Sequence, residues 1–212
     1  MIGKGKSISH GVAALEYDLA KEINGQAVAT EIARHELYGC TGAEMVQEMK
    51  PYHIDFPNVK NNCLRFEVSP SIEESATFTD ADWAELGNDF MQRMGLANHQ
   101  YIIIRHSGTE SKKEQAHLHI LANRVSLSGE LYRDNWIGKK ATEAANAIAK
   151  ERNFVQSQDI GKVNKAEIKE AMDGVLKKMQ GFDFTKFKEE LGKRGFKVRE
   201  ARASTGKLNG YY

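Results

Sequence analysis

Three histidines near the middle of the chain have the residue type and spacing of a metal site. His117 and His119 flank Leu118 in an apolar segment, and His106 follows the apolar run at residues 101–105. Side chains alternate between the two faces of a β-strand, so the imidazoles of His117 and His119 project from one face. If His106 ends a neighbouring antiparallel strand, its imidazole can reach the same point, because paired strands lie about 4.8 Å apart. Three neutral imidazoles on a rigid sheet can hold a divalent metal and leave positions for water or substrate.

A His-x-His pair is also common as plain polar surface, so the third histidine carries much of the metal prediction. Strict alternation places His106 on the same face as Ile102 and Ile104, two apolar residues. Two alternatives follow from this conflict. Either the end of the strand bulges or twists and turns His106 toward its partners, or His106 is not a ligand.

Hydrophobic periodicity predicts the elements that must position these histidines. Strands are expected at residues 1–8 and 62–69, and in the second one Arg65 and Glu67 would share the polar face with the histidines. Helices are expected at residues 9–22, 41–51, 79–95 and 135–152, the first capped by Ser9 with Val12 on its buried side. Residues 26–40 are ambiguous between strand and helix.

Helices alternate along the chain with strands that have one apolar and one polar face, and this pattern predicts an α/β (α+β) fold. A mostly antiparallel central sheet would have helices over one face and the metal or ligand site on the other, open face. We expect residues 1–160 to form the catalytic core. Residues 161–212, with basic helices at 164–180 and 184–194 and a strand pattern from 196, would complete the same domain. Because the last pattern stops at Tyr212, we expect the natural chain to continue.

Composition places the chain in a broad class. Hydrophobic residues make up 41% and charged residues 28%, as in ordinary globular proteins. No apolar run approaches the roughly 20 residues that span a bilayer, and the N-terminus lacks a signal-peptide core, so we expect a cytoplasmic protein. Cys40 and Cys63 have no metal-ligand spacing and are expected to be reduced, buried thiols.

The small net charge of +1 hides an asymmetry along the chain. Residues 1–100 contain 8 Lys and Arg against 15 Asp and Glu, a net charge of −7, whereas residues 101–212 contain 22 against 14, a net charge of +8. The basic half holds the three histidines. Such a distribution suits a protein that presents a positive face to a polyanion, although basic helices are often only solvated surface.

A three-histidine metal site near basic residues can do two kinds of work. It can activate water for hydrolysis, or it can hold a phosphodiester while another group attacks. The second reaction needs a nucleophile, and a tyrosine becomes competent when metal and cations neutralise the phosphate and a base takes its proton. Tyr17 lies in the first predicted helix, where half-buried packing is the ordinary role of a tyrosine.

The pattern of His106, His117-x-His119, Asn123 and Arg124 resembles the histidine motif of the HUH-type relaxases, the mobilisation nucleases of plasmids and integrative elements. Residues 5–19, which include Tyr17, are similar to the N-terminal strand and tyrosine-bearing helix of that family. Residues 90–101 and 194–211 are similar to its approach to the first histidine and to its closing strands. The resemblance therefore covers nearly the whole chain, and the histidine pattern is its specific part.

The resemblance implies a metal-dependent tyrosine DNA endonuclease. Such an enzyme is a site- and strand-specific nickase and ligase that acts on single-stranded DNA at an origin of transfer through a 5′-phosphotyrosyl intermediate. Tyr17 would be the nucleophile, and His106, His117 and His119 would hold Mg²⁺ or Mn²⁺ against the phosphate. Accessory proteins of the relaxosome are further partners that the resemblance implies.

The chain departs from the family in the loop after the first histidine. Gly108 stands where an acidic residue is usual, and the loop to His117, with a hairpin end expected at 110–114, is longer. Glu67 could replace the acid as an orienting group or general base, because alternation places it on the polar face. Candidate DNA contacts, any of which could also be solvated surface, are Lys4, Lys6, Arg65, Arg105, Asn123, Arg124 and Arg133.

Three other functions remain open at this point. A rolling-circle replication initiator of the same class usually has its tyrosine after the histidines, whereas Tyr17 precedes them. A three-histidine zinc hydrolase without a DNA substrate would bind zinc tightly and tolerate Tyr17→Phe. A single-strand-binding module would show salt-dependent binding without cleavage.

Overall fold

The computed structural model describes residues 1–108 and 115–211, so the expected hairpin end at 110–114 lies outside the described residues. The chain divides into two compact units, Met1–Ser157 and Gln158–Tyr212. Each unit has its own hydrophobic core. It stays a prediction that residues 161–212 complete the catalytic domain.

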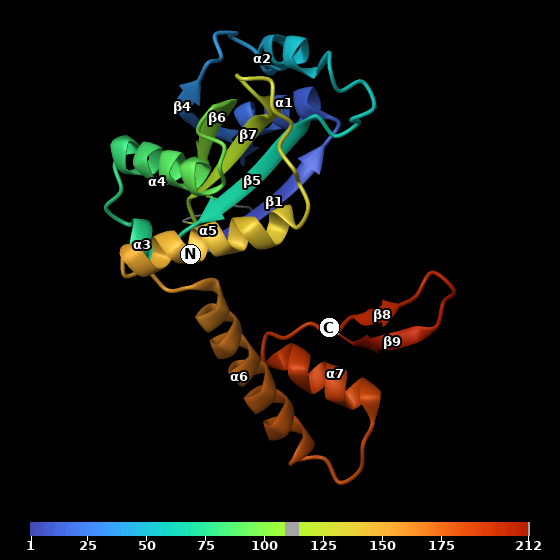
Figure 1. Ribbon diagram of the computed structural model, residues 1–212. Coiled ribbons are helices and arrows are strands. Elements are labelled where there is room, and N and C mark those ends of the chain that lie inside the picture. The colour runs from blue at the N-terminus through green and yellow to red at the C-terminus, as the bar shows by residue number, and fades with distance from the viewer. Residues whose placement is uncertain (109–114, 212) are drawn as a thin grey trace. The chain divides into compact units, whose positions relative to one another are not determined.

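A five-stranded antiparallel sheet forms the centre of the first unit, in the order β1-β5-β7-β6-β4 (Figure 1). These strands are β1 (Ile2–Ile8), β4 (Ala29–His35), β5 (Cys63–Ser69), β6 (His99–His106) and β7 (His117–Ser126). The segment that was ambiguous from sequence supplies β4, which pairs with β6, after a small hairpin of β2 (Glu22–Ile23) and β3 (Gln26–Ala27). The mixed α/β class with a mostly antiparallel sheet is confirmed.

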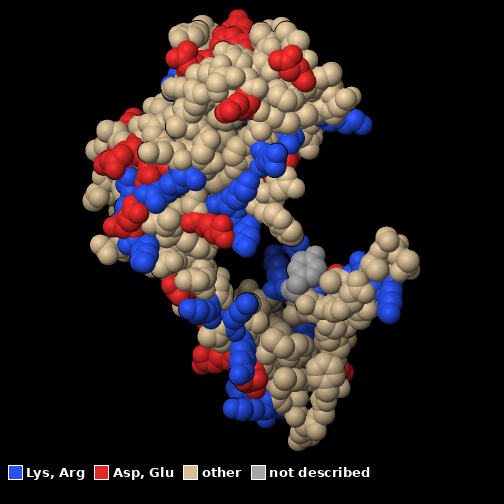
Figure 2. Space-filling view, in the orientation of Figure 1, with Lys and Arg blue, Asp and Glu red and all other residues tan. Residues whose placement is uncertain are grey.

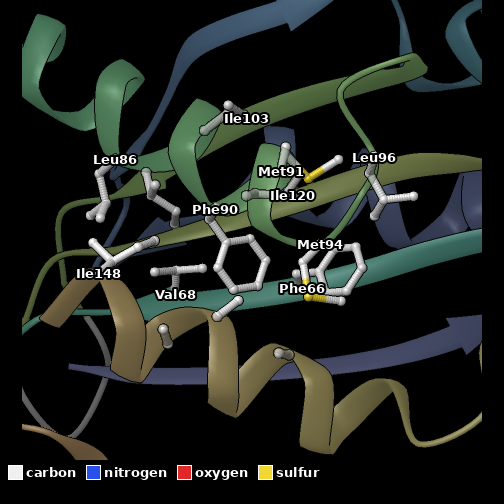
Figure 3. Packing of buried hydrophobic residues seen from close by; sticks show 14 of the residues in the cluster. Phe66, Val68, Leu86, Phe90, Met91, Met94, Leu96, Ile103, Ile120 and Ile148 are labelled. Atoms are coloured by element: carbon white, nitrogen blue, oxygen red, sulfur yellow. The ribbon is translucent and has the colours of Figure 1, made fainter. Parts of the chain in front are cut away.

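One face of the sheet packs against α4 (Asp80–Arg93) and α5 (Ile137–Glu151). Phe66, Ile103 and Ile120 point to this face from three neighbouring strands, because side chains alternate along each strand. Figure 3 shows them with Phe90 and other helix residues in one apolar layer. The helix predicted from residue 79 is confirmed, and Thr79 caps α4 through a capping box with Asp82.

The other face is partly covered by α1 (Gly11–Leu19) and α2 (Gly42–Met49). Leu15 and Met45 from these helices belong to one buried cluster with Ile102, Ile104 and Leu121 of the sheet. The expectation of a face open along its whole length is therefore too simple. Its apolar half is buried under helices, and its other half carries the histidines.

Two details of the first helix differ from the sequence prediction. The helix begins at Gly11 with His10 as its N-cap, whereas Ser9 was predicted, because β1 continues to Ile8 and a turn must follow it. Val12 is 39% exposed, so its predicted burial is wrong. The short elements η1 (Lys50–His53) and α3 (Ile72–Ser75) connect the larger ones.

The second unit consists of α6 (Ser157–Leu176), α7 (Phe184–Lys193) and a hairpin of β8 (Glu200–Arg202) and β9 (Leu208–Tyr211). Its small core contains Ala171, Val175, Phe187 and Leu191. The predicted strand from residue 196 is shorter in the structure, because Phe196 and Val198 pack against this core before the strand pairing begins.

Both cysteines are free thiols, as expected, but only Cys63 is buried. Burial raises the pKa of the Cys63 thiol to about 11. The prediction of a buried thiol is wrong for Cys40, which lies in the exposed turn that precedes the Thr41 cap. Within residues 1–108 and 115–211, no helix is long and apolar enough to cross a bilayer.

Ile120→Ala is expected to lower the free energy of unfolding by about 2–5 kcal/mol. Ile120 is fully buried at the centre of the apolar layer, so the substitution leaves a cavity. Chemical denaturation of the first unit measures the effect. The matched control is Ile54→Ala, because Ile54 is 76% exposed and its loss should change stability by less than about 0.5 kcal/mol. Equal effects of the two substitutions would contradict the assignment of Ile120 to the core.

Candidate functional site

The three histidines converge on the part of the sheet face that the helices leave uncovered. His106 lies opposite His117 in the pairing of β6 with β7, and Ile104 lies opposite His119. The ring centroids are 4.5 Å apart for His106 and His119, 4.9 Å for His117 and His119, and 5.4 Å for His106 and His117. One ring nitrogen from each histidine lies within 4.8 Å of the other two. The structure thus brings together all three predicted ligands.

Neither of the two alternatives for His106 is needed. The register between His106 and His117 is regular, and His106 does share its face with Ile102 and Ile104. The error lay in treating this face as either apolar or polar throughout. One face changes character along its length, from isoleucines under α1 and α2 to imidazoles at the end of the strands.

The surroundings favour the uncharged form of two imidazoles in this cluster, those of His106 and His119. Burial lowers the pKa of His119 to about 2, and repulsion from any proton on His106 or His117 acts in the same direction. Burial also lowers the pKa of His106, against the hydrogen bond between its Nε2 and the carbonyl oxygen of Asp18. Neutral imidazoles offer the lone pairs that a metal ion needs. The donor set therefore fits a divalent cation.

A hydrogen bond fixes the orientation of His117. Its Nδ1 lies 3.1 Å from the carbonyl oxygen of Gln115, an acceptor, so Nδ1 must carry the proton. The lone pair of His117 is then on Nε2, which lies 3.1 Å from Nε2 of His119. Such a carbonyl partner for the second ring nitrogen is typical of histidines that bind metals.

Asp18 is a site residue that the sequence analysis missed. Its side chain is 2% exposed, and both carboxylate oxygens accept hydrogen bonds from Arg65. The distance from Nε of Arg65 to Oδ2 of Asp18 is 3.0 Å. Nη2 of Arg65 also lies 3.4 Å from Nδ1 of His119. Burial raises the pKa of Asp18 and the Arg65 guanidinium opposes this. The sequence did contain a signal for the burial of Asp18. It follows the buried Leu15 by three positions on α1, and residues three apart lie on the same face of a helix.

Tyr17 precedes Asp18 in the last turn of α1 and does not pack into the core. Its side chain is 56% exposed, which removes the ordinary packing role considered from sequence. The phenol oxygen accepts a hydrogen bond from Nζ of Lys21 at 2.7 Å, and this ammonium also lies 4.9 Å from the ring centroid. The predicted nucleophile is therefore accessible, next to a cation, and adjacent in sequence to a residue that contacts the histidines.

Predicted basic residues meet the histidine cluster along one row of the sheet. Lys4 lies opposite Glu67, and Glu67 lies opposite His119, so β1, β5 and β7 each contribute one side chain. Nζ of Lys4 and Oε1 of Glu67 are 2.9 Å apart. Lys4, Glu67 and His119 line a pocket of about 210 Å³. Lys6 and Arg65 line this pocket as well. The predicted placement of Glu67 on the histidine face agrees with this register.

Two predicted DNA contacts, Arg105 and Asn123, lie elsewhere. Arg105 is one position away from His106, so alternation turns it to the opposite face, where it pairs with Asp80 at the start of α4. Asn123 is fully buried and hydrogen bonds to the side chains of His53 and Gln100. The prediction for Asn123 is wrong, because this side chain is fully buried inside the protein. Arg105 faces away from the histidine cluster, and its contact with DNA stays a prediction.

The structure also argues against Arg124 as a DNA contact, whereas Arg133 remains a candidate DNA contact. The Arg124 guanidinium donates to the carbonyl oxygens of Asn61 and Tyr132 at 2.9 and 3.1 Å and to the carboxylate of Asp134 at 2.6 Å. These bonds join two loops and leave the side chain 13% exposed. Arg133, in contrast, is exposed.

Comparison with known protein families now decides the family. The model of the relaxase family, described as the MobA/VirD2-like nuclease domain, matches residues 17–154. The chain belongs to the relaxase family. The matched region begins at Tyr17, contains all three histidines and covers more than half of this relaxase. Family membership implies DNA nuclease activity, and the resemblance stated from the sequence is confirmed.

Solved structures of a conjugative relaxase, TrwC, are similar at low sequence identity. A metal-bound complex of TrwC with oriT DNA is 12% identical, with a TM-score of 0.42, over 98% of this chain and 74% of that chain. A copper-bound complex is also 12% identical, with a TM-score of 0.28, over 98% of this chain and 64% of that chain. None of the curated proteins matches the sequence. The match at residues 17–154 is what shows the family.

Proposed function

We propose that this relaxase nicks single-stranded DNA at an origin of transfer and reseals it through a 5′-phosphotyrosyl intermediate on Tyr17. The observation that carries the proposal is the contact between the tyrosine-bearing helix and the histidine cluster. His106 hydrogen bonds to the backbone of Asp18, and the Asp18 carboxylate lies 3.8 Å from His119. The residue before Asp18 is an exposed tyrosine. The helix that bears the proposed nucleophile is therefore in direct contact with the metal-ligand set.

His106, His117 and His119 would hold the metal, for which we propose Mg²⁺ or Mn²⁺. When bound, the ion supplies positive charge that neutralises and polarises the scissile phosphate. Lys4 and Lys6, which line the pocket beside His119, would bind neighbouring phosphates.

The phenol oxygen of Tyr17 would form a bond to phosphorus as the bond from phosphorus to the 3′-oxygen breaks. The phenol proton leaves to a base, and the 3′-oxygen takes up a proton and departs as a hydroxyl. Because the phosphotyrosyl bond is a phosphodiester like the one it replaces, the reverse attack reseals the strand without a nucleotide cofactor. Lys21, which hydrogen bonds to Tyr17, would hold the phenol oxygen during the attack.

The test uses labelled single-stranded oligonucleotides that tile the origin of transfer of the parent element, incubated with the chain and Mg²⁺ or Mn²⁺. On a denaturing gel we expect a protein-linked DNA band together with a fragment that ends in a free 3′-hydroxyl. Cleavage without a protein-linked band would overturn the tyrosine mechanism in favour of metal-bound water. Salt-dependent binding without cleavage would favour a binding module.

Glu67→Gln is expected to slow cleavage by about 10²- to 10⁴-fold if Glu67 acts as the general base. Glu67 faces the pocket beside His119, with Lys4 as its ion-pair partner. Single-turnover cleavage rates measure the effect. The control is Glu190→Gln, which removes another solvent-exposed Glu–Lys pair, with Lys193. Cleavage and Mn²⁺ affinity that both stay at wild-type levels in Glu67→Gln would remove this role.

A further inference from the structure

Trp136 has an unusual combination of backbone and exposure. It precedes α5 with φ of 59° and ψ of 27°, in the left-handed region. A bulky residue seldom adopts this conformation, because its Cβ crowds the backbone, and such strain concentrates at functional sites. The indole is 81% exposed. The chain thus keeps a large apolar ring in water at a position where glycine would be relaxed.

The charges around Trp136 are mostly positive. Arg133 and Lys139 are exposed. Lys140 is half-buried: its Nζ donates to the carbonyl oxygen of Arg133 at 2.8 Å and lies 5.0 Å from the ring centroid of Tyr132. Two acids lie nearby: Asp134 accepts from Arg124, and the Glu143 carboxylate is 3.8 Å from Nζ of Lys139 in an exposed pair that leaves this ammonium open to solvent. We name the surface formed by Arg133, Trp136, Lys139 and Lys140 the indole patch.

The indole patch lies beside the strand that carries the basic residues of the histidine pocket. A Cβ on Gly138, two residues after Trp136, would be 3.5 Å from the carbonyl oxygen of Gly5. Gly5 stands between Lys4 and Lys6, so these two side chains point to the opposite face of β1 from α5 and line the pocket with His119. A DNA strand that contacts both the pocket and the indole patch would have to pass around the edge of the sheet. β1 is the edge strand of the sheet, and α5 runs along it (Figure 1). In Figure 2, Lys and Arg side chains lie over the region where Figure 1 shows β1 and α5, with Asp and Glu side chains among them.

We propose that the indole patch binds single-stranded DNA, with Trp136 stacked on a base and Arg133, Lys139 and Lys140 at the neighbouring phosphates. The charge of the patch complements a polyanion, and an exposed indole can stack on an unstacked base. Both features together fit a single strand better than a duplex, whose base faces are hidden. The proposal takes its substrate class from the proposed function, but it requires binding alone.

Intrinsic fluorescence can test this directly, because the two tryptophans differ in exposure. Trp83 is 2% exposed and Trp136 is 81% exposed. The full chain is titrated in EDTA with an oligothymidylate of about 20 nucleotides, longer than the usual site of a single binding unit. We expect quenching of the long-wavelength emission of Trp136. Trp136→Phe should abolish the quenching and keep most of the affinity, because a phenyl ring can still stack.

Trp136→Ala is expected to weaken binding about tenfold in fluorescence anisotropy, the loss typical of one stacked base. Trp136→Gly should weaken it equally while leaving the midpoint of thermal unfolding unchanged or higher, since glycine relieves the positive φ. The matched control is Tyr38→Ala. Tyr38 is 77% exposed, its hydroxyl donates to Glu36 and its backbone N–H donates to Glu48. These acidic neighbours disfavour a polyanion, so loss of the Tyr38 side chain should leave DNA binding unchanged.

The outcomes separate this inference from the proposed function. Binding without quenching, wild-type affinity in Trp136→Ala, or no binding of the oligonucleotide would each overturn the indole patch as a DNA site. Quenching and weakened binding of Trp136→Ala in a chain that never forms a protein–DNA link would keep the patch and refute the tyrosine mechanism. A protein–DNA link with unchanged affinity of Trp136→Ala would do the reverse.

Discussion

Tyr17→Phe is expected to eliminate the protein-linked DNA product, with a loss of cleavage of about 10⁴-fold or more, as when other enzymes lose their nucleophile. The phenyl ring lacks the oxygen that must bond to phosphorus. The fold should survive, because the Tyr17 side chain is 56% exposed and its described hydrogen bond is to Lys21 at the surface. Single-turnover cleavage on denaturing gels measures the loss, and anisotropy in EDTA should show unchanged affinity for single-stranded DNA.

Tyr211→Phe provides the comparison for this experiment. Tyr211 is also exposed, at 48%, and lies in the hairpin of the second unit. The Tyr211→Phe variant should therefore cleave DNA at the wild-type rate. If Tyr17→Phe still forms a protein-linked product, the nucleophile is another residue. If it releases unlinked fragments at the wild-type rate, water is the attacking group and the three-histidine hydrolase becomes the better description.

His119→Ala is expected to weaken Mn²⁺ binding by about 100-fold or more, since even residues that only support a ligand commonly contribute 10- to 100-fold. His119 is the histidine closest to both partners, with its ring centroid 4.5 and 4.9 Å from theirs. Titration calorimetry with Mn²⁺ measures the affinity. Cleavage should fall in parallel, and EDTA should stop cleavage by the wild-type chain while single-stranded DNA binding persists.

The matched control is His10→Ala. His10 is an exposed N-cap of the same helix that bears Tyr17, and its side chain makes no capping hydrogen bond. Its loss should leave Mn²⁺ affinity and cleavage unchanged. Wild-type Mn²⁺ affinity in His119→Ala would remove the histidine cluster as the metal site. Tight stoichiometric zinc with cleavage that tolerates Tyr17→Phe would support the hydrolase instead.

Local pattern was enough to predict the parts of the site that depend on one strand or one helix. Alternation placed His117 with His119 and Glu67 on the polar face, and both placements depend only on the period of a strand. The family resemblance then singled out Tyr17. The contact between its helix and the histidine cluster, made through Asp18, depends on how α1 packs on the sheet, which no local pattern encodes.

The errors arose where non-local packing decides the environment of a side chain. Arginine is a residue type that often binds phosphate, but the Arg124 guanidinium donates instead to carbonyl oxygens in loops near residues 61 and 132. Asn123 lies on the predicted face, yet His53 from a distant turn covers it. The face of His106 was misjudged because helices bury only half of it. Sequence periodicity gives the face of a residue and not what covers that face.

The buried pair of Asp18 and Arg65 restricts how this site can change during evolution. Replacing either partner alone leaves an uncompensated charge in a buried environment, which typically costs about 3–5 kcal/mol, whereas replacing both with apolar residues can be nearly neutral. Any path between the two states therefore passes through a less stable intermediate. We expect related chains to keep both residues or to change both, so that the two positions, 47 residues apart, are inherited as one unit.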